Sequence, residues 1–334
     1  MQNSRKRATL ATVAASAGVS VATVSKVLNG RSDVAPITRE LVQSLLVEQG
    51  YVTRPSRRPP AMVELQVSGE LCAYSTEIIK GTLEAGGESG VPVVVTNVKG
   101  APPAGDAWAR GLAAAGRRAM ILLTDEPSPR QVAALTRAGL PVVVINPLNP
   151  PPTPVTSIGA TNFAGGMSAT QHLLALGHRR IACLGGPADA ASNQARMHGY
   201  RAAMEAAGVP VLPGYVRTAG FCYPDGLRAS AGLLDVEPLP TAVFAASEEI
   251  ALALMWVARE RGLRVPEDLS VVGFDDTEIA AMTSPPLTTV RQPLREMGVV
   301  ALRTALRLAA GETIESRHIE LATELVVRGS SLAA

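Results

Sequence analysis

The sequence predicts a small all-α head, residues 1–52, joined by a linker, residues 53–61, to an α/β body with parallel sheets, residues 62–334. Three observations support this division. Apolar residues near the N-terminus recur at helical spacing, prolines and arginines cluster directly after them, and the rest of the chain alternates short apolar runs with amphipathic stretches. At 334 residues the chain is also too long for one compact core.

Composition indicates a globular protein of the reducing cytoplasm. Hydrophobic residues make up 47% of the chain, and apolar runs such as Pro141–Ile145 are far below the roughly 20 residues that span a bilayer. Residues 1–7 are polar and basic with no apolar core after them, so we expect neither a secretory signal nor a membrane partner. The four histidines and three cysteines show no metal-ligand spacing, so we expect no metal site and no cofactor. The cysteines are Cys72, Cys183 and Cys222.

Charge is unevenly distributed along the chain. Residues 1–60 hold nine Lys or Arg against three acidic residues, a balance of +6, whereas the whole chain carries only +2, which leaves −4 for the remainder. A basic head on a mildly acidic body is the pattern expected of a protein that contacts phosphates. A solvated basic surface gives the same balance, so charge alone does not decide.

The head sequence predicts a helix-turn-helix between Thr9 and Leu28. Thr9 is a good N-cap, apolar residues follow at i, i+3, i+4 and i+7 from Leu10, and Gly18 ends this helix because glycine tolerates positive φ. Ser20 caps a second helix after a three-residue turn. Two short helices at this spacing are the geometry that places a recognition helix in the major groove.

We expect the second helix to read DNA. Val21 and Ala22 at its start can touch thymine methyl groups, and the neighbouring polar side chains can contact bases or phosphates. The expected DNA-contacting residues of the head are Thr9, Ser20, Val21, Ala22, Thr23, Ser25, Lys26 and Asn29. A helical hairpin that contacts another protein is the alternative.

A third helix, residues 36–49, is expected to complete the core of the head, with proline at its start. The side chains that it is expected to turn inward are Ile37, Leu41, Leu45 and Leu46.

From residue 62 onward the chain alternates predicted strands and helices. The strand candidates are Met62–Val67, Val91–Thr96, Ala119–Leu123, Val142–Ile145, Arg180–Leu184, Ala242–Ala245 and Ser270–Gly273. The helix candidates are Glu77–Glu88, Pro129–Ala138, Gly166–Leu176, Arg196–Ala207 and Glu248–Arg261. This βαβα order predicts two lobes, each a parallel sheet with helices on both faces, and the ligand site is expected at the carboxyl ends of the strands.

Several stretches of the chain are specific enough to indicate a family. The head contains VAASAGVSVATVSKVLNG, then TRE and EQGY. The body contains NFAGGMSATQHLLALGHRRIACLGG, GLRVPEDLSVVGFDD, PPLTTVRQP and ELVVRGSS. These stretches resemble those of the lactose-repressor (LacI/GalR) family of bacterial transcription regulators. The resemblance covers nearly the whole chain and is weakest between Thr53 and Thr96.

The resemblance implies a two-lobed body like that of periplasmic sugar-binding proteins, in which the chain passes between the lobes three times. We expect these passages near Ser157, Thr289 and Leu321. The expected lobes are about 62–157 plus 290–320 and about 158–289 plus 321–334. Hinged lobes of this kind convert ligand binding into relative rotation.

The resemblance also implies an effector pocket. Arg196, in SNQARMHGY, matches an arginine whose guanidinium can hold a hydroxyl pair or a carboxylate, and Asp275, in GFDD, matches a carboxylate that accepts hydrogen bonds from sugar hydroxyls. Phe221 stands where members often present an aromatic ring to a ligand. The expected effector-binding residues are Tyr74, Asn146, Arg196, Phe221, Ser247 and Asp275. Structural roles are the alternatives: a helix-surface pair, a turn and plain core for Arg196, Asp275 and Phe221 respectively.

The chain departs from the family pattern at several polar positions of this pocket. It has Ser247-Glu248 where the family usually has Asn-Asp. It has Thr161-Asn162 where Asp-Asn is usual, and Asn146 where Asp is common. These departures leave the identity of the ligand open.

The linker is a second departure. Family members usually carry a short hinge helix here, which inserts a leucine into the minor groove. This chain reads RPSRRPP, with Pro60 at the wedge position, and its prolines disfavour a helix. Arg57 and Arg58 are expected to reach the minor groove or phosphates instead, so we expect less DNA bending than is usual in the family.

The resemblance therefore implies a sequence-specific DNA-binding transcription regulator. We expect a repressor that acts as a homodimer on near-palindromic double-stranded operator DNA, and a sugar or related polyol that changes its operator affinity. No enzyme is expected, because neither a nucleophile with its base nor a P-loop appears. The alternatives are a free solute-binding protein, an activator, or a regulator that ignores small molecules.

Overall fold

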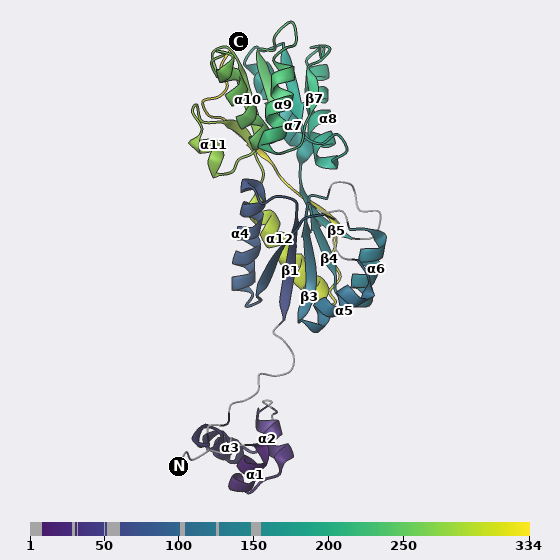
Figure 1. The fold of residues 1–334 in the computed structure, drawn as a ribbon, viewed down its shortest axis with the longest axis vertical. Helices are drawn as coiled ribbons and strands as arrows, with labels where there is room; N and C mark the ends of the chain where they lie inside the picture. Colours follow the sequence, from purple (N-terminus) through teal and green to yellow (C-terminus); the bar gives the residue numbers. More distant parts are fainter. Residues whose placement is uncertain are drawn as a thin grey trace. The chain divides into compact units, whose positions relative to one another are not determined.

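The chain divides into two compact units, Met1–Pro59 and Pro60–Ala334, referred to below as the head and the body (Figure 1). The computed structural model describes residues 9–28, 31, 33–49, 51, 61–100, 104–124, 127–147 and 155–334. The predictions for Asn29, Arg57, Arg58 and Pro60, and for the linker up to that proline, therefore lie outside the described residues.

The head is built from α1 (Leu10–Ala17), α2 (Val21–Leu28) and α3 (Pro36–Glu48). The Thr9 hydroxyl accepts from the Thr12 N–H at 3.2 Å, and Thr12 Oγ1 accepts from the Thr9 N–H at 2.8 Å, so a capping box begins α1. Gly18, at φ 66°, ends it. The predicted helix-turn-helix is confirmed, and its buried core contains Val13, Ala14, Val24, Val27, Val34, Val42 and Leu46.

The predicted inward face of α3 is partly wrong. Ile37 is 82% exposed and Leu41 is 45% exposed, whereas Val42 is fully buried. Val42, Leu45 and Leu46 lie at i, i+3 and i+4, so these residues form the stripe that faces α1 and α2. Leu41 precedes Val42 by one residue and is therefore rotated by about 100° away from that stripe.

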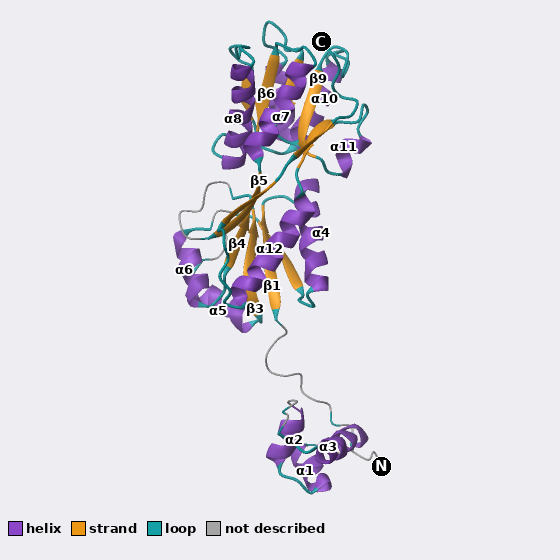
Figure 2. Ribbon diagram, turned by 180° about the vertical axis from the view of Figure 1, so that it is seen from behind, coloured by secondary structure: helices purple, strands orange, loops and turns teal. Residues whose placement is uncertain are grey.

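The first lobe of the body is a parallel sheet with the strand order β11-β5-β4-β3-β1-β2. Its strands are β1 (Met62–Ser68), β2 (Val93–Val98), β3 (Arg117–Leu123), β4 (Val142–Ile145), β5 (Thr156–Ala160) and β11 (His318–Leu321). Its helices are α4 (Ala73–Glu88), α5 (Asp106–Ala114), α6 (Pro129–Arg137) and α12 (Leu294–Ala309). Helices α4 and α12 cover one face, and α5 and α6 cover the other (Figures 1 and 2).

The second lobe repeats this plan with the order β12-β10-β9-β8-β6-β7. Its strands are β6 (Ile181–Gly185), β7 (Val216–Thr218), β8 (Ala242–Ala245), β9 (Ser270–Asp275), β10 (Thr288–Arg291) and β12 (Glu324–Val326). Its helices are α7 (Asn162–Ala175), α8 (Ala191–Ala206), α9 (Tyr223–Leu233), α10 (Glu248–Glu260) and α11 (Glu278–Met282). The predicted α/β fold is confirmed, with the addition that edge strand β12 pairs antiparallel with β10.

The described chain passes between the lobes after β5, after β10 and after β11. The first two passages lie a few residues beyond the expected ones at Ser157 and Thr289, because β5 and β10 continue to Ala160 and Arg291 before the chain leaves each sheet. The third passage follows Leu321, the last residue of β11.

No single helix among the described residues is long and apolar enough to span a membrane. Helices α1 and α2 would meet the length and composition test only if taken together, and the chain bends by 105° between them.

Candidate functional site

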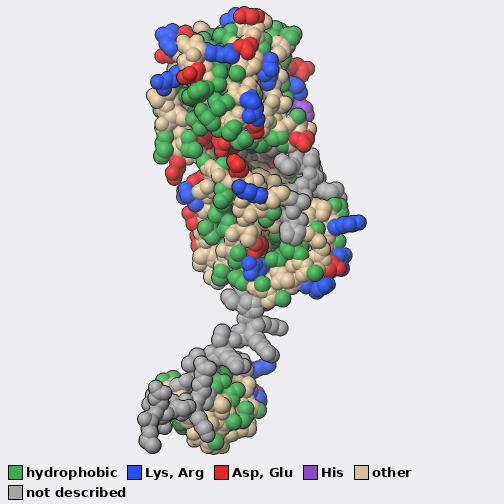
Figure 3. Space-filling model, viewed as in Figure 1, with side chains coloured by type: hydrophobic (Ala, Val, Ile, Leu, Met, Phe, Trp, Pro, Cys, Tyr) green, Lys and Arg blue, Asp and Glu red, His purple; other side chains and the backbone are tan. Residues whose placement is uncertain are grey.

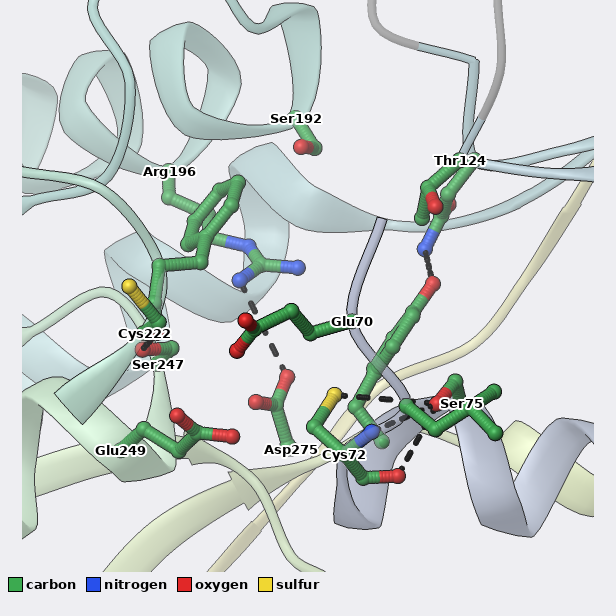
Figure 4. A pocket seen from close by; sticks show the side chains of 14 residues that line it. Glu70, Cys72, Ser75, Thr124, Ser192, Arg196, Cys222, Ser247, Glu249 and Asp275 are labelled. Atoms are coloured by element: carbon green, nitrogen blue, oxygen red, sulfur yellow. Dashed lines mark hydrogen bonds and ion pairs between the residues drawn. The ribbon is translucent and has the colours of Figure 1, made fainter. Parts of the chain in front are cut away.

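A cavity of about 540 Å³ lies at the carboxyl ends of strands from both lobes of the body (Figure 4). Glu70, Thr124 and Asn146 follow strands β1, β3 and β4 of the first lobe. Ser247 follows β8 of the second lobe, and Asp275 ends β9. Parallel strands aligned in this way bring their loops to one edge, which is where open α/β sheets bind ligands.

The structure brings all the predicted effector-binding residues to this one cavity: Tyr74, Asn146, Arg196, Phe221, Ser247 and Asp275. Sequence reasoning missed the other residues that line it: Glu70, Leu71, Cys72, Ser75, Thr124, Ser192, Cys222 and Glu249. Most of these residues follow a strand or lie near the start of a helix, within a few residues of a predicted effector-binding residue. That position was the signal that could have identified them.

Arg196 lies on the floor of the cavity with only 3% of its surface exposed. Its Nε donates to Asn162 Oδ1 at 2.8 Å and its Nη1 donates to the Ala246 carbonyl at 2.5 Å. The same Nη1 is 3.9 Å from Asp275 Oδ1. Nη2 makes no hydrogen bond with the described residues, so one edge of the guanidinium stays available to a ligand oxygen.

Two aromatic rings make cation–π contacts with the Arg196 guanidinium. Its central carbon is 3.8 Å from the Phe274 ring centroid and 5.6 Å from that of Phe221. Helix α8 also packs closely on α7, since a Cβ on Gly166 would lie 2.2 Å from the Arg196 carbonyl oxygen. Arg196 was predicted to stand at the start of its helix, but α8 begins at Ala191, so the arginine is in its second turn.

Asp275 is 6% exposed and has a positive φ of 114°. Gln292 Nε2 donates to its Oδ1 at 2.6 Å, and the Glu248 N–H lies 3.4 Å from its Oδ2. Burial raises the pKa of Asp275 to about 6, although the Arg196 charge opposes this shift. The residue is thus a buried acceptor at the cavity floor, and its second role is to join β9 to the interlobe segment that contains Gln292.

Ser247 and Glu248 occupy the start of α10. The Ser247 hydroxyl donates to the Phe221 carbonyl at 3.1 Å and accepts from the Ile250 N–H at 3.2 Å, so it caps the helix. Glu248 is buried beside the cavity and accepts from the Thr277 N–H at 2.9 Å. Burial raises the pKa of Glu248 to about 7.

A hydrogen bond between two neutral side chains stabilises the first-lobe wall of the cavity. Asn146 Nδ2 donates to the Tyr74 hydroxyl at 2.5 Å, which ties the loop after β4 to the first turn of α4. Asn146 has a positive φ of 44°, a conformation that asparagine adopts more readily than most residues. Burial raises the pKa of Tyr74, so its hydroxyl stays neutral.

The predicted DNA-contacting residues from Ser20 to Lys26 lie on α2 or directly before it. Val21 is 47% exposed, and Ala22 beside it is also exposed. The Ser20 hydroxyl accepts from the Thr23 N–H at 3.1 Å and also lies 2.9 Å from Thr23 Oγ1. Ser25 is half-buried on the same helix. These side chains form one surface, which we refer to as the α2 face.

Lys26 belongs to the α2 face and is exposed. Its Nζ contacts Asp33 Oδ2 at 2.7 Å, and this contact lowers the pKa of Asp33. Thr9 uses its hydroxyl to cap α1, so its contribution to DNA contact is limited to atoms left free by that cap.

Charged side chains are scattered over both lobes on the face of the body drawn in Figure 3, and acidic ones also lie at the waist between the lobes. Among the described residues, no group of three or more His, Cys, Asp or Glu side chains is arranged to hold a metal ion.

A helix-turn-helix head and a two-lobed α/β body with a cavity between its lobes define a DNA-binding transcription regulator. Residues 9–54 match the family of bacterial regulatory proteins of the lacI family, and residues 170–331 match the periplasmic binding protein-like domain. The chain belongs to the lacI family. Members are DNA-binding regulators, so it is not an enzyme.

Individual relatives match along their full length. The HTH-type transcriptional regulator CelR of Thermobifida fusca is 38% identical over 98% of this chain and 99% of its own. A solved CelR–cellobiose complex superposes with a TM-score of 0.72 at 36% identity, covering 97% of this chain and 100% of that one. The Lac repressor dimer bound to operator and the anti-inducer ONPF gives 0.78 at 29% identity, covering 98% and 100%.

Proposed function

We propose that this protein is a repressor whose operator affinity is switched by a small saccharide or related polyol in the interlobe cavity. The observation that carries the proposal is the floor of that cavity, where Arg196 presents a free guanidinium edge beside the buried acceptor Asp275. A donor fork and an acceptor side by side suit vicinal hydroxyls, and Phe221 adds an apolar ring to the wall. The relative whose structure contains cellobiose supports a saccharide.

The DNA-binding unit is proposed to be a homodimer. Two heads related by a two-fold axis would place two α2 faces on the half-sites of a near-palindromic operator. The Lac repressor structure, a dimer on its operator, supports this arrangement. A protein that binds operator DNA would act in the cytoplasm.

The proposed contacts on the DNA are those of the α2 face. Val21 and Ala22 meet base methyl groups, while Thr23, Ser25 and Lys26 contact bases or phosphates. Ser20 and Thr9 act at the helix starts. Ligand in the cavity would favour one arrangement of the lobes, and the operator affinity would follow that arrangement.

The proposal is tested on the full-length protein. An operator is first selected from random duplex DNA, and its affinity is then measured by fluorescence anisotropy while mono- and disaccharides, both neutral and amino-substituted, polyols and nucleosides are titrated. We expect one class to change operator affinity by about 5- to 150-fold, the usual range for allosteric coupling. Analytical ultracentrifugation and footprinting check the dimer and its two half-sites.

If no compound in the panel changes operator affinity, the ligand switch is wrong and a regulator that ignores small molecules takes its place. If the selected operator has a single half-site, the homodimer arrangement is wrong.

A further inference from the structure

The carboxylates of the interlobe cavity indicate the charge of its ligand. We propose that the effector is an amino saccharide, whose protonated amine lies between Glu70 and Glu249. The inference rests on the proposed function, since it assumes that this cavity binds the effector, and it adds the chemical group by which the effector is selected.

The cavity is lined by more negative than positive side chains. Glu70, Glu249 and Asp275 contribute carboxylates, and Arg196 contributes the one guanidinium among the described lining residues. Glu70 comes from the loop after β1 in the first lobe, whereas Glu249 comes from the first turn of α10 in the second. Figure 4 shows both carboxylates directed into the same central space as Arg196 and Asp275.

The positive charge of Arg196 is already balanced. Its Nη1 lies 3.9 Å from Asp275, and its remaining hydrogen bonds go to the neutral oxygens of Asn162 and Ala246. Arg196 and Asp275 therefore form a buried pair of opposite charges. What remains in the lining is the charge of Glu70 and Glu249.

Neither of these two glutamates has a cationic partner among the described residues. Glu249 Oε2 accepts from the Tyr223 N–H at 2.9 Å, which fixes the carboxylate without neutralising it. Glu77 on α4 differs from them, since its carboxylate contacts both Lys80 and Arg295 at 2.6 Å. Glu70 is exposed and Glu249 is half-buried, and both line the cavity without a cationic partner among the described residues.

A ligand that enters this space meets two negative charges from opposite lobes. An anionic saccharide, such as a sugar phosphate or a uronic acid, would be disfavoured, because juxtaposed like charges repel. A protonated amine would form charge-assisted hydrogen bonds with both carboxylates, and these are about twice as strong as neutral ones. Contact with both lobes at once would also favour the arrangement in which they close on the ligand.

The same pose uses the features already described. The saccharide hydroxyls meet Nη2 of Arg196 and the Asp275 carboxylate, while a sugar ring lies against Phe221. The amine then points toward the cavity space between Glu70 and Glu249. Hydroxyl recognition and amine recognition are therefore separate, so they can be tested separately.

The experiment compares three matched disaccharides on the full-length protein by isothermal titration calorimetry at about pH 7 and low salt. The probes are the β-1,4-linked dimers of glucose, of glucosamine and of N-acetylglucosamine. We expect the glucosamine dimer to bind at least tenfold more tightly than the glucose dimer, and the N-acetyl dimer to lose this advantage because its nitrogen is uncharged. The advantage should shrink as salt is raised, since the cavity is open to ions.

Three variants locate the effect. Glu70→Gln and Glu249→Gln should each reduce the preference for the amine about tenfold while leaving the affinity for the glucose dimer within about twofold, because the amide retains the hydrogen-bonding oxygen. Glu260→Gln is the matched control: it removes a carboxylate from the exposed end of the same helix, outside the cavity, and should keep the full preference.

The outcomes are distinguishable. If the glucose dimer binds as tightly as the glucosamine dimer and changes operator affinity, the amino-saccharide inference is wrong while the proposed function stands. If no dimer binds, this inference is overturned, and the anisotropy panel then decides the proposed function. If Glu260→Gln abolishes the preference as fully as Glu249→Gln does, general surface charge is the cause and the assignment to the cavity is wrong.

Discussion

The head and the body present their functional side chains in opposite ways. Val21 and Lys26 of the α2 face are exposed, and Lys26 has an exposed partner in Asp33. Arg196 and Asp275 of the body are 3% and 6% exposed and are surrounded by fixed hydrogen bonds. The head therefore desolvates its contacts when it meets DNA, whereas the body has already desolvated its charges on folding.

This difference predicts different kinds of mutational effect. Changes on the α2 face should alter operator affinity and its salt dependence, with little effect on folding. Changes at the cavity floor should alter ligand affinity, stability and pH dependence together, since a buried group contributes to all three. Each of the following predictions tests one side of this contrast.

The largest effect is expected at the cavity floor. Arg196→Ala should reduce effector affinity more than 100-fold, about 3 to 5 kcal/mol, because it removes the donor and leaves Asp275 buried without its partner charge. Operator affinity without effector should be unchanged. Calorimetry and anisotropy measure the two quantities, and Arg196→Lys tests the need for a fork, since lysine keeps only the charge. A normal effector response in Arg196→Ala would contradict the claim that the buried cavity floor determines effector affinity.

The second effect concerns pH. The pKa of Glu248 is raised from 4.5 to about 7, so the folded protein holds this proton where the unfolded chain has released it. The free energy of unfolding should therefore fall as pH rises from about 5 to about 8, and Glu248→Gln should remove up to about 3 kcal/mol of that fall. Denaturant unfolding at both pH values measures it.

Glu260→Gln is the control for this experiment, because it removes an exposed carboxylate from the same helix. A pH dependence that is identical in Glu248→Gln and in the wild type would show that the buried carboxyl is not its source. Asp275, with a pKa raised to about 6, accounts for part of the dependence that remains.

A smaller effect is expected on the α2 face. Lys26→Ala should weaken operator binding about five- to tenfold and reduce the salt slope by about one, since one phosphate contact is lost. Asp33→Asn should act in the opposite direction, because it releases Lys26 from its ion pair. Anisotropy over a range of salt concentrations measures both.

Lys99→Ala provides the matched control, because it removes an exposed lysine of the body. Loss of stability in Lys26→Ala, or an unchanged salt slope, would contradict the assignment of Lys26 to DNA contact.

The smallest effect is expected on the first-lobe wall. Tyr74→Phe removes the hydroxyl that accepts from Asn146 and should cost the body about 1 kcal/mol of stability, with only a few-fold change in effector affinity. Thermal unfolding and calorimetry check these values. If Tyr74→Phe reduced effector affinity as much as Arg196→Ala does, the first-lobe wall and the cavity floor would contribute equally to ligand binding.

Much of the fold could be predicted from the sequence, because local signals agree with tertiary structure. Thr9, Gly18 and Ser20 marked the helix ends of the head, and the continuous apolar runs Val142–Ile145 and Ala242–Ala245 coincide with the central strands β4 and β8. The short strands β5, β7, β10, β11 and β12 were missed as candidates, since their residues, such as Thr-Ser-Ile-Gly-Ala in β5, show neither a long apolar run nor clear alternation.

The sequence predicted only some of the residues that line the cavity, because the others show no local pattern. Arg196 and Asp275 lie in family motifs, so the resemblance indicated them. Glu70 and Glu249 have no local pattern that separates them from ordinary surface glutamates, and only the folded chain places them opposite each other. Burial on α3 was misassigned at Leu41 because two adjacent leucine-rich stripes fit a helical period, and tertiary packing selected the one with Val42.

The C-terminal segment has a consequence for how this protein is made. Helix α12 and strand β11 complete the first lobe, and β12 then completes the second. Beyond β12, the fully buried Ser330 donates to the Val271 carbonyl at 2.6 Å and accepts from the Thr288 N–H at 2.8 Å. During synthesis neither lobe can close until these C-terminal segments have left the ribosome, whereas the head emerges first, so newly made chains can fold a DNA-binding head before they possess the interlobe cavity.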